Sequence, residues 1–420
     1  MKSPIHLILT GALGTAASLA ALTATSAVAC AATTVLVIPG TGTKDPAPVP
    51  GYLEHSIQYY VSPTGACEAD GCVTKPVPYI AEFGPLPFEG WGGPLGTQLD
   101  DSVASGISSA KSVYEDTDSM DSRVVFGYSQ GATVASELKR ELAAKPGGVP
   151  ENVSFVAIAN PSRPNGGIFQ RLAPLKWTGP AFGATFGRSS PTRTSANVNT
   201  TDIALQYDGV TDFPTYPTNV LATANAMAGF MYSHGTYLSP KDDDTPTATP
   251  LGYHPHEVAD AVRAAKSSCT ADTHCQVSGD TRYITLPAPI LPLALPLIEH
   301  GPSSAMRPLV DFASPIARTA IETGYTRDDY ARPTPLSLDS SNAPTPQESL
   351  AASVTEGLHA AITGTGDASR YLDKRANQNE NSPTPADDET AGTVPQNAQE
   401  DVVTTVRSAV DELIGIPRTK

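Results

Sequence analysis

The fold of this chain is indicated by the stretch RVVFGYSQGATVA, residues 123–135. Its aliphatic start is typical of a buried strand, and apolar residues with helical spacing follow up to residue 142. Ser129 lies at the turn, with Gly127 and Gly131 two residues away on either side. In such a pattern the glycines let the strand and the helix approach closely around a strained serine. We predict a nucleophilic serine; a plain strand-turn-helix is the alternative.

Further strands and helices alternate on both sides of this stretch. Such alternation is typical of an α/β fold with a mostly parallel central sheet and helices on both faces. We interpret residues 44–90, which are rich in Pro, Gly and Tyr, as a connection along the surface. The predicted strands are 34–38, 122–127, 153–159, 201–207 and 281–286, and the predicted helices are 91–115, 131–144, 217–231 and 256–267.

A serine nucleophile needs a histidine base and an acid that orients this base. Two acids, Asp208 and Asp212, lie in the turn after the predicted strand 201–207. We prefer Asp212, which lies further into the turn, and keep Asp208 as the alternative acid. His234 follows on a loop and completes the chain order Ser, Asp, His. The competing bases stand where a helix is expected to begin, and they are His254 and His256.

A serine hydrolase also needs an oxyanion hole, a pair of backbone N–H groups that stabilise the negative charge formed during acyl transfer. One donor is expected from Gln130, the residue after the nucleophile. The second is expected from the glycine-rich turn after the first strand, at Thr41 or Gly42. A tight turn without a catalytic role is the alternative for this second segment.

Composition and charge argue against nucleic acid as a partner. The chain has 420 residues, of which 40% are hydrophobic, and a formal net charge of −16. This apolar content is sufficient for a buried core. Lys and Arg are not clustered, and the acidic excess opposes binding to a phosphate backbone. We expect no nucleic-acid partner and no cofactor.

Residues 1–31 have the features of a cleavable signal peptide. Lys2 precedes a stretch without charged residues from 4 to about 22, and small residues follow up to Ala31. The apolar part is too short and too dilute for a membrane span. We predict cleavage after Ala31, and a mature protein that is secreted or held in the cell envelope.

Export makes disulfides possible, and the cysteines fall into two local pairs. Their spacings are wider than those of a Cys-x-x-Cys metal site, so we predict two disulfides and no metal site. Cys30 is left over and is expected to leave with the signal peptide. A lipid-modified Cys30 is the alternative. The predicted disulfides are Cys67 with Cys72 and Cys269 with Cys275.

The region after the predicted catalytic domain differs in composition. We assign residues 32–338 to an α/β-hydrolase domain and 339–420 to an acidic, Pro/Thr-rich, partly disordered extension. In this extension we expect weak helices near 346–363 and 400–414, disorder over 376–398, and a solvating role without catalytic residues.

The run 287–297 combines prolines with aliphatic residues. It is too short to cross a bilayer, and its prolines argue against a regular helix. We expect no stable transmembrane anchor. The sequence leaves the oligomeric state open.

Several motifs together resemble the PE-PPE domain of mycobacteria and related actinobacteria. The resemblance covers roughly residues 34–335 and implies a cutinase-like α/β-hydrolase fold with a Ser-Asp-His triad. It implies Ser129 as nucleophile and His234 as base, and leaves the acid open between Asp212 and Asp208. The motifs are GYSQG at 127–131, NPSRPNGG at 160–167, YDGVTDFP at 207–214 and YSHGTY at 232–237, with GDTRY at 279–283 and the region around 324–325 in addition.

From the resemblance we expect an exported carboxylesterase or lipase that acts on short to medium acyl chains, with a lipid or other ester as substrate. Some relatives of this family are acyltransferases that move fatty acyl groups between trehalose glycolipids, which is the first alternative. A non-catalytic envelope protein that binds lipid is the second. The complete order of Ser, Asp and His argues against the second alternative.

Overall fold

A seven-stranded sheet with the order β2-β1-β3-β4-β5-β7-β6 forms the centre of the structure. The structure is a computed structural model that describes residues 33–67, 71–191, 199–239, 252–253, 256–300 and 303–380. All neighbouring strands are parallel except β6, which runs antiparallel to β7. The strands are β1 (Thr33–Ile38), β2 (Cys72–Pro76), β3 (Arg123–Tyr128), β4 (Val153–Ile158), β5 (Thr200–Leu205), β6 (Cys275–Ser278) and β7 (Thr281–Leu286).

The middle strands are almost entirely apolar because both of their faces are covered. Every residue of β3 is buried, and so are all residues of β1 after Thr33. Parallel strands covered by helices on both sides have this near-continuous apolar character. The predicted α/β class with a mostly parallel sheet is therefore confirmed.

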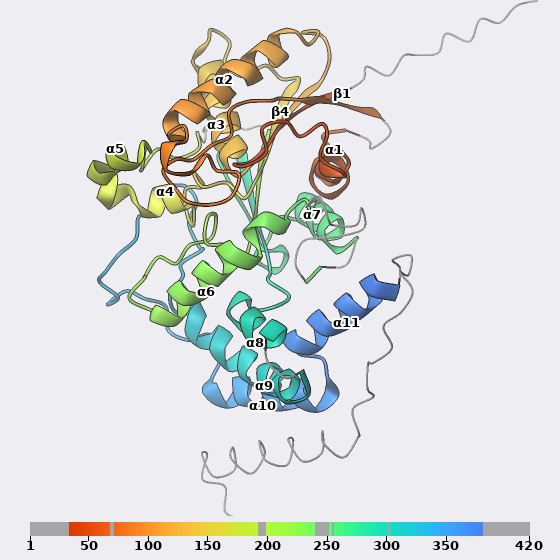
Figure 1. Cartoon of the computed structure of the whole chain (residues 1–420), viewed down its shortest axis with the longest axis vertical. Helices are drawn as coiled ribbons and strands as arrows, with labels where there is room; N and C mark the ends of the chain where they lie inside the picture. The colour runs from red at the N-terminus through yellow and green to blue at the C-terminus, as the bar shows by residue number, and fades with distance from the viewer. Residues whose placement is uncertain are drawn as a thin grey trace, which may run out of the picture. The chain divides into compact units, whose positions relative to one another are not determined.

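Different helices cover the two faces of the sheet (Figure 1). On one face, α2 (Leu99–Glu115) and α3 (Gln130–Ala144) pack against β1, β3 and β4. On the other face, the π-helix η1 (Ser56–Val61) and α7 (Glu257–Ser267) pack against strand residues such as Phe126. The shorter elements of the sheet region are α1 (Tyr52–His55), η2 (Ser62–Thr64), η4 (Gly93–Leu95), α4 (Ile168–Arg171), η5 (Ala173–Thr178), α5 (Gly179–Phe182), η6 (His234–Thr236) and η7 (Ala271–Thr273).

The interpretation of residues 44–90 as a surface connection is wrong. This segment contains α1, η1 and the edge strand β2, and it buries Tyr52, Tyr60 and Val61 in the core. Its periodicity is hard to recognise because the π-helical turns do not repeat every 3.6 residues. The predicted helix 91–115 also starts later, at Leu99.

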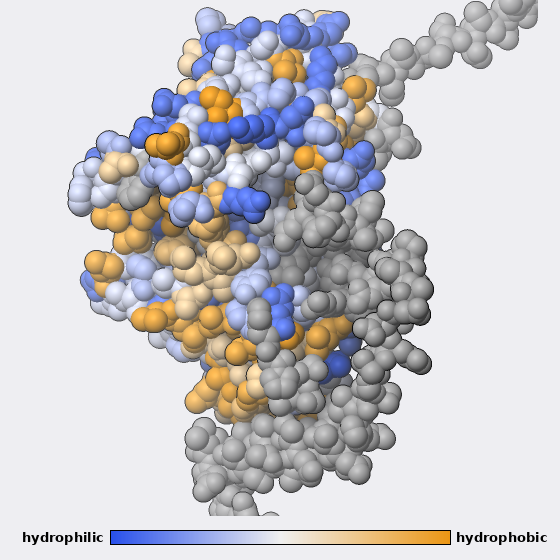
Figure 2. Space-filling view, viewed as in Figure 1, coloured by the Kyte–Doolittle hydropathy of each residue, from blue (hydrophilic) through white to orange (hydrophobic). Residues whose placement is uncertain are grey.

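A third apolar cluster lies beyond the carboxyl ends of β5 and β7. It joins α6 (Val220–Tyr232), η8 (Pro292–Ala294), α8 (Leu295–His300) and α9 (Ser303–Glu322) around Tyr207. The outer surface of α6 is apolar, as the orange and pale-orange atoms over this helix in Figure 2 show.

The run 287–297, predicted to lack a regular helix, contains two short helical pieces. These are η8 and the first turn of α8, where prolines are tolerated because the first N–H groups of a helix need no intrahelical partner. Among the helices that the structure describes, none is long and apolar enough to cross a membrane.

The described part of the C-terminal extension packs onto the domain, so its interpretation as a solvating appendage is wrong for this part. Its helices are α10 (Leu350–Thr363) and α11 (Asp367–Glu380). Helix α10 buries a face of small residues against α9, and Gly357 leaves no room for a Cβ beside the carbonyl of Phe312. Residues 381–420, which include the predicted helix 400–414, lie outside the described residues, as does the predicted signal peptide.

Both predicted disulfides are present. Cys67 is bonded to Cys72, next to the edge strand β2, and Cys269 is bonded to Cys275 at the start of β6. Each disulfide closes a short loop at one border of the sheet. Cys30 lies outside the described residues.

The close contact between α3 and the end of β1 generates a stability prediction. A Cβ at Gly131 would overlap the carbonyl oxygen of Ile38, and the atoms it meets are backbone. Gly131→Ala should therefore lower the free energy of unfolding by about 2 kcal/mol or more, measured by urea denaturation. Gly71→Ala is the control, since a Cβ there meets nothing within 4 Å. Equal stability of the two variants would contradict the packing described.

Candidate active site

The candidate site lies where the strand order reverses, at the carboxyl ends of β1 and β3. The chain continues from β1 to β2 on one side and, further along, to β3 on the other. Connections that diverge in this way leave a crevice at the strand ends, where ligands bind in open α/β sheets. Ser129 follows β3 and Thr41 lies shortly after β1, so both residues stand at this end of the sheet.

The backbone at Ser129 is strained, as the sequence pattern predicts. Its φ is +53°, in the region that L-residues rarely adopt. A Cβ at Gly127 would overlap the carbonyl oxygen of Gly131. Glycines at these two positions therefore allow the sharp turn, which leaves the serine side chain partly exposed at the strand end.

His234 is the histidine that meets Ser129. Its Nε2 lies 2.9 Å from the Oγ of Ser129. The residue begins η6, directly after α6, and its carbonyl accepts a hydrogen bond from the hydroxyl of Tyr128. Of the competing histidines, His256 is the N-cap residue of α7, and His254 lies outside the described residues.

Asp208, rather than the preferred Asp212, is the acid beside His234. The Nδ1 of His234 lies 2.9 Å from one carboxylate oxygen of Asp208 and 3.1 Å from the other. The carboxylate is fully buried and also accepts hydrogen bonds from the N–H of Val210 and the hydroxyl of Tyr237, at 2.9 Å each. Asp208 is therefore held rigidly in a position to orient the histidine ring.

The hydroxyl of Tyr237 donates a hydrogen bond to the carboxylate of Asp208. Burial first, and then the nearby Asp208 carboxylate, raises the pKa of Tyr237 well above its usual range. The hydroxyl therefore keeps its proton and donates to Asp208. Sequence reasoning missed this role, although Tyr237 lies only three residues after His234 in the YSHGTY motif.

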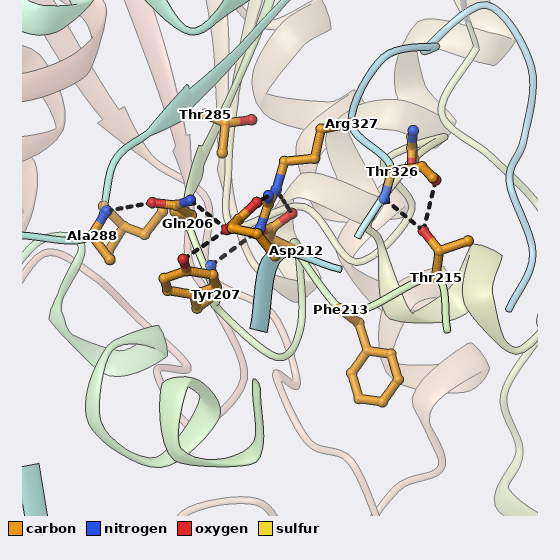
Figure 3. A network of polar contacts seen from close by, with 12 residues as sticks. Gln206, Tyr207, Asp212, Phe213, Thr215, Thr285, Ala288, Thr326 and Arg327 are labelled. Carbon is orange, nitrogen blue, oxygen red and sulfur yellow. Dashed lines mark hydrogen bonds and ion pairs between the residues drawn. The ribbon is translucent and has the colours of Figure 1, made fainter. Parts of the chain in front are cut away.

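Asp212 has a different partner, which explains why the preference for it is wrong. Arg327 donates to both of its carboxylate oxygens at 2.9 to 3.1 Å, and the N–H of Tyr207 donates at 2.8 Å (Figure 3). Arg327 is also paired with Glu322 at 2.6 Å. The turn folds back after Asp208, where the N–H of Asp212 donates a hydrogen bond to the carbonyl of Asp208. The side chain of Asp212 is therefore paired with Arg327, and this ion pair stabilises the turn.

Two backbone N–H groups are available for an oxyanion. Those of Thr41 and Gln130 have no hydrogen-bond acceptor within the described part of the chain. The amide of Gln130 starts α3, where N–H groups lack intrahelical partners. Gly42, the other predicted donor of the turn, is excluded because its N–H donates to the carbonyl of Ala81 at 2.8 Å.

The side chain of Gln130 connects the start of α3 to the turn after β1. Its Nε2 donates to the Oγ1 of Thr41 at 3.1 Å and to the carbonyl of Glu82 at 3.0 Å. Its Oε1 accepts from the hydroxyl of Ser102 at 2.8 Å. All hydrogen-bonding atoms of this buried amide are thus directed at neighbours that hold the turn after β1 in place.

Aromatic side chains border the site on the side of α6. Phe230, on the last turn of this helix, lies 5.9 Å from the ring of His234. The ring of Phe230 also contacts Phe88 and Trp91, at centroid distances of 5.7 and 6.2 Å. Trp91 in turn borders Gly42. An apolar wall therefore reaches from His234 to the turn after β1.

A cavity of about 820 Å³ lies beside the turn that carries Asp208 and Asp212. Tyr207, Glu322 and Arg327 contribute to its lining, and neither Ser129 nor His234 does. This cavity therefore does not mark the candidate active site, which is defined by the hydrogen-bonded side chains of Ser129, His234 and Asp208. Within the described ranges, no group of three or more His, Cys, Asp or Glu residues is arranged to bind a metal ion.

A serine, a histidine and an aspartate linked in series, beside two free amides at a strand end, form a site of the serine-hydrolase type. The chain belongs to the PE-PPE domain family, since the model of the PE-PPE domain matches residues 81–326. The predicted family is thus confirmed.

Two curated relatives carry functional names. "Esterase PE16" of Mycobacterium tuberculosis (strain ATCC 25618 / H37Rv) is 35% identical over 310 residues, which are 73% of this chain and 51% of that protein. "Diacyltrehalose acyltransferase Chp2" of the same strain is 28% identical over 223 residues, 52% of this chain and 55% of that protein. The chain thus spans about half the length of these two relatives.

Solved structures with partial similarity include "A novel cutinase-like protein from Cryptococcus sp.", at 17% identity and a TM-score of 0.27, covering 44% of this chain and 81% of that one. Lysin B from Mycobacteriophage D29 matches at 20% identity and a TM-score of 0.24, covering 32% of this chain and 48% of that one.

The different surroundings of the two aspartates generate a prediction. Asp208→Asn should lower the rate constant for labelling by a fluorophosphonate probe by about 10³-fold or more, because it removes the carboxylate that holds the histidine tautomer. Asp212→Asn should lower the free energy of unfolding by about 3 kcal/mol, because it leaves Arg327 without its buried partner. The rate constant for labelling of the folded Asp212→Asn variant should fall by less than about tenfold.

The same probe with Ser129→Ala gives the background rate, and urea denaturation gives the stability of each variant. Loss of labelling in Asp212→Asn, together with near-normal labelling in Asp208→Asn, would contradict the assignment of the acid.

Proposed function

We propose that this chain is a serine carboxylesterase that hydrolyses esters of short to medium acyl chains through an acyl-enzyme on Ser129. The observation that carries the proposal is the relay in which Ser129 Oγ, His234 and Asp208 are joined by contacts of 2.9 Å. The name of the relative "Esterase PE16" supports the same activity.

Acylation follows from this geometry. The Oγ of Ser129 attacks the carbonyl carbon of the ester while Nε2 of His234 accepts its proton. Asp208 stabilises the imidazolium through Nδ1, and the amides of Thr41 and Gln130 stabilise the oxyanion. Each such donor contributes about 3 kcal/mol to the transition state. The tetrahedral intermediate collapses as His234 protonates the leaving alcohol, so that the acyl group stays on Ser129.

Deacylation repeats these steps with water as the nucleophile. His234 takes a proton from the water, and the hydroxyl oxygen bonds to the acyl carbon. The second intermediate releases the carboxylic acid as His234 returns the proton to Ser129. No cofactor enters either half of the reaction.

Transfer to a sugar hydroxyl is the second candidate, and the similarity to "Diacyltrehalose acyltransferase Chp2" favours it. The first half-reaction is identical, and the acceptor hydroxyl takes the place of water in the second half. Transfer requires a site that excludes water and positions the acceptor. The wall of Phe88, Trp91 and Phe230 is a surface against which the apolar part of an acceptor lipid could pack.

We further propose that the enzyme acts outside the cytoplasm, as the composition of residues 1–31 predicts. The two disulfides support an oxidising compartment. A non-catalytic lipid-binding role is less well supported, because a protein without catalysis has no need for a buried acid aligned on a histidine beside a strained serine.

Substrate preference is tested with p-nitrophenyl esters of increasing acyl length. The wild-type protein should hydrolyse esters from acetate to octanoate, and Ser129→Ala should lower kcat by about 10⁴-fold or more. With trehalose present, mass spectrometry of the products should detect the free acid as the main product.

Two outcomes would contradict the esterase proposal. Equal activity of Ser129→Ala and wild type would exclude Ser129 as nucleophile. Acyl-trehalose as the main product would favour the transferase over the esterase. Gly71→Ala, far from the site and without close neighbours, serves as the control for preparation and folding.

A further inference from the structure

Helix α6 exposes most of its large apolar side chains, and the residues that it buries are small. The helix contains no charged residue, and Val220, Met227 and Met231 are 77%, 54% and 66% exposed. Leu221 and Ala224 are exposed as well. A surface helix normally directs polar residues to solvent, and an exposed apolar face of this kind marks an interaction site.

Packing inside the protein does not require these exposed side chains. The buried side of α6 consists of Ala222, Asn225, Ala226 and Gly229. A Cβ at Gly229 would overlap the carbonyl oxygen of Tyr207, so the helix sits directly on the turn that carries Asp208. Small residues thus anchor the helix. The large apolar residues on the opposite face remain exposed and are available to contact a binding partner.

The apolar face is continuous with the aromatic side chains that border His234 and the turn after β1. Phe230 joins α6 to Phe88, which is itself 39% exposed, and to Trp91 beside the turn after β1. His234 follows the helix after a single residue. Figure 2 shows the apolar surface over α6. A rigid partner protein that covered this face would also border the entrance to Ser129, whereas a lipid surface would cover the face and supply the ester.

Charge favours an uncharged lipid surface over an anionic one. The protein carries a net charge of −16, and α6 has no Lys or Arg to attract anionic head groups. Apolar insertion into the boundary between head groups and acyl chains is the remaining source of affinity.

On these grounds we propose that α6, together with Phe88 and Trp91, docks the protein on the surface of uncharged acyl lipids, with Ser129 facing the lipid. This inference rests on the proposed ester substrate. It adds the physical state of that substrate, namely a lipid aggregate instead of a dissolved molecule.

Vesicle binding tests the docking surface directly. Wild-type full-length protein should sediment with phosphatidylcholine vesicles, and binding should not weaken between about 50 and 500 mM NaCl, because apolar insertion is not screened by salt. The double variant Met227→Glu/Met231→Glu should bind at least about tenfold more weakly. Both positions are exposed, so the fold should be retained, and circular dichroism checks this.

Met120→Glu is the matched control. Met120 is 83% exposed and precedes β3, whereas Ser129 follows it, so the two lie at opposite ends of the same strand. This control should bind vesicles as the wild type does. The double variant should also lower the ratio of hydrolysis of emulsified ester to hydrolysis of dissolved p-nitrophenyl butyrate by about tenfold, and the control should not.

Three results would overturn the proposal. The first is wild type that does not bind the vesicles, and the second is a double variant that binds as wild type does. The third is a photo-crosslinker at position 227 that reacts with a second copy or with another part of the same chain instead of lipid. Vesicle binding is measured with Ser129→Ala as well, so failure of the esterase proposal is distinguished from failure of docking.

Discussion

The close approach of three backbone segments around Ser129 is the constraint on which the site depends. The end of β1, the end of β3 and the start of α3 meet where Gly127 and Gly131 leave no room for side chains. This contact places Gln130 beside the turn after β1, where its side chain donates a hydrogen bond to Thr41. The strained φ of Ser129 turns its side chain toward His234. Residues far apart in the sequence thus form one site because the backbone can pack at this point.

Local sequence patterns predicted the strands and turns whose formation depends on residues close together in the chain. The strands that become β1, β3, β4, β5 and β7 were predicted from their apolar residues and the turns that follow them. Ser129 stands directly after β3, and His234 stands on the loop after helix α6. The acid could not be assigned in this way, because Asp208 and Asp212 differ only in their distant partners. Arg327, 115 residues after Asp212, occupies the carboxylate of Asp212. Likewise, Gly42 is excluded as an oxyanion donor because its N–H is bonded to Ala81, far along the chain. Residues within 44–90 are buried because they pack against the sheet, which their local sequence does not reveal.

The segments beyond the sheet support the catalytic turn from two sides. Helix α6 rests on the turn through Ala226 and Gly229, and Arg327, just after α9, holds the turn through Asp212. Helix α10 packs on α9 and so belongs to the same support, which its composition did not reveal. The apolar outer face of α6 therefore lies on a helix that packs directly against the turn that carries Asp208. A surface that positions lipid at this face would deliver the ester to a site that is already arranged.

The proposed reaction requires that Ser129 forms a covalent acyl intermediate with the aid of His234 and Asp208. Rapid acid quenching during turnover of a p-nitrophenyl ester, followed by peptide mapping with mass spectrometry, would trap this intermediate. We expect an acyl group on the peptide that contains Ser129, with a mass increase equal to that of the acyl chain. No covalent adduct during turnover, or an adduct on another residue, would contradict it.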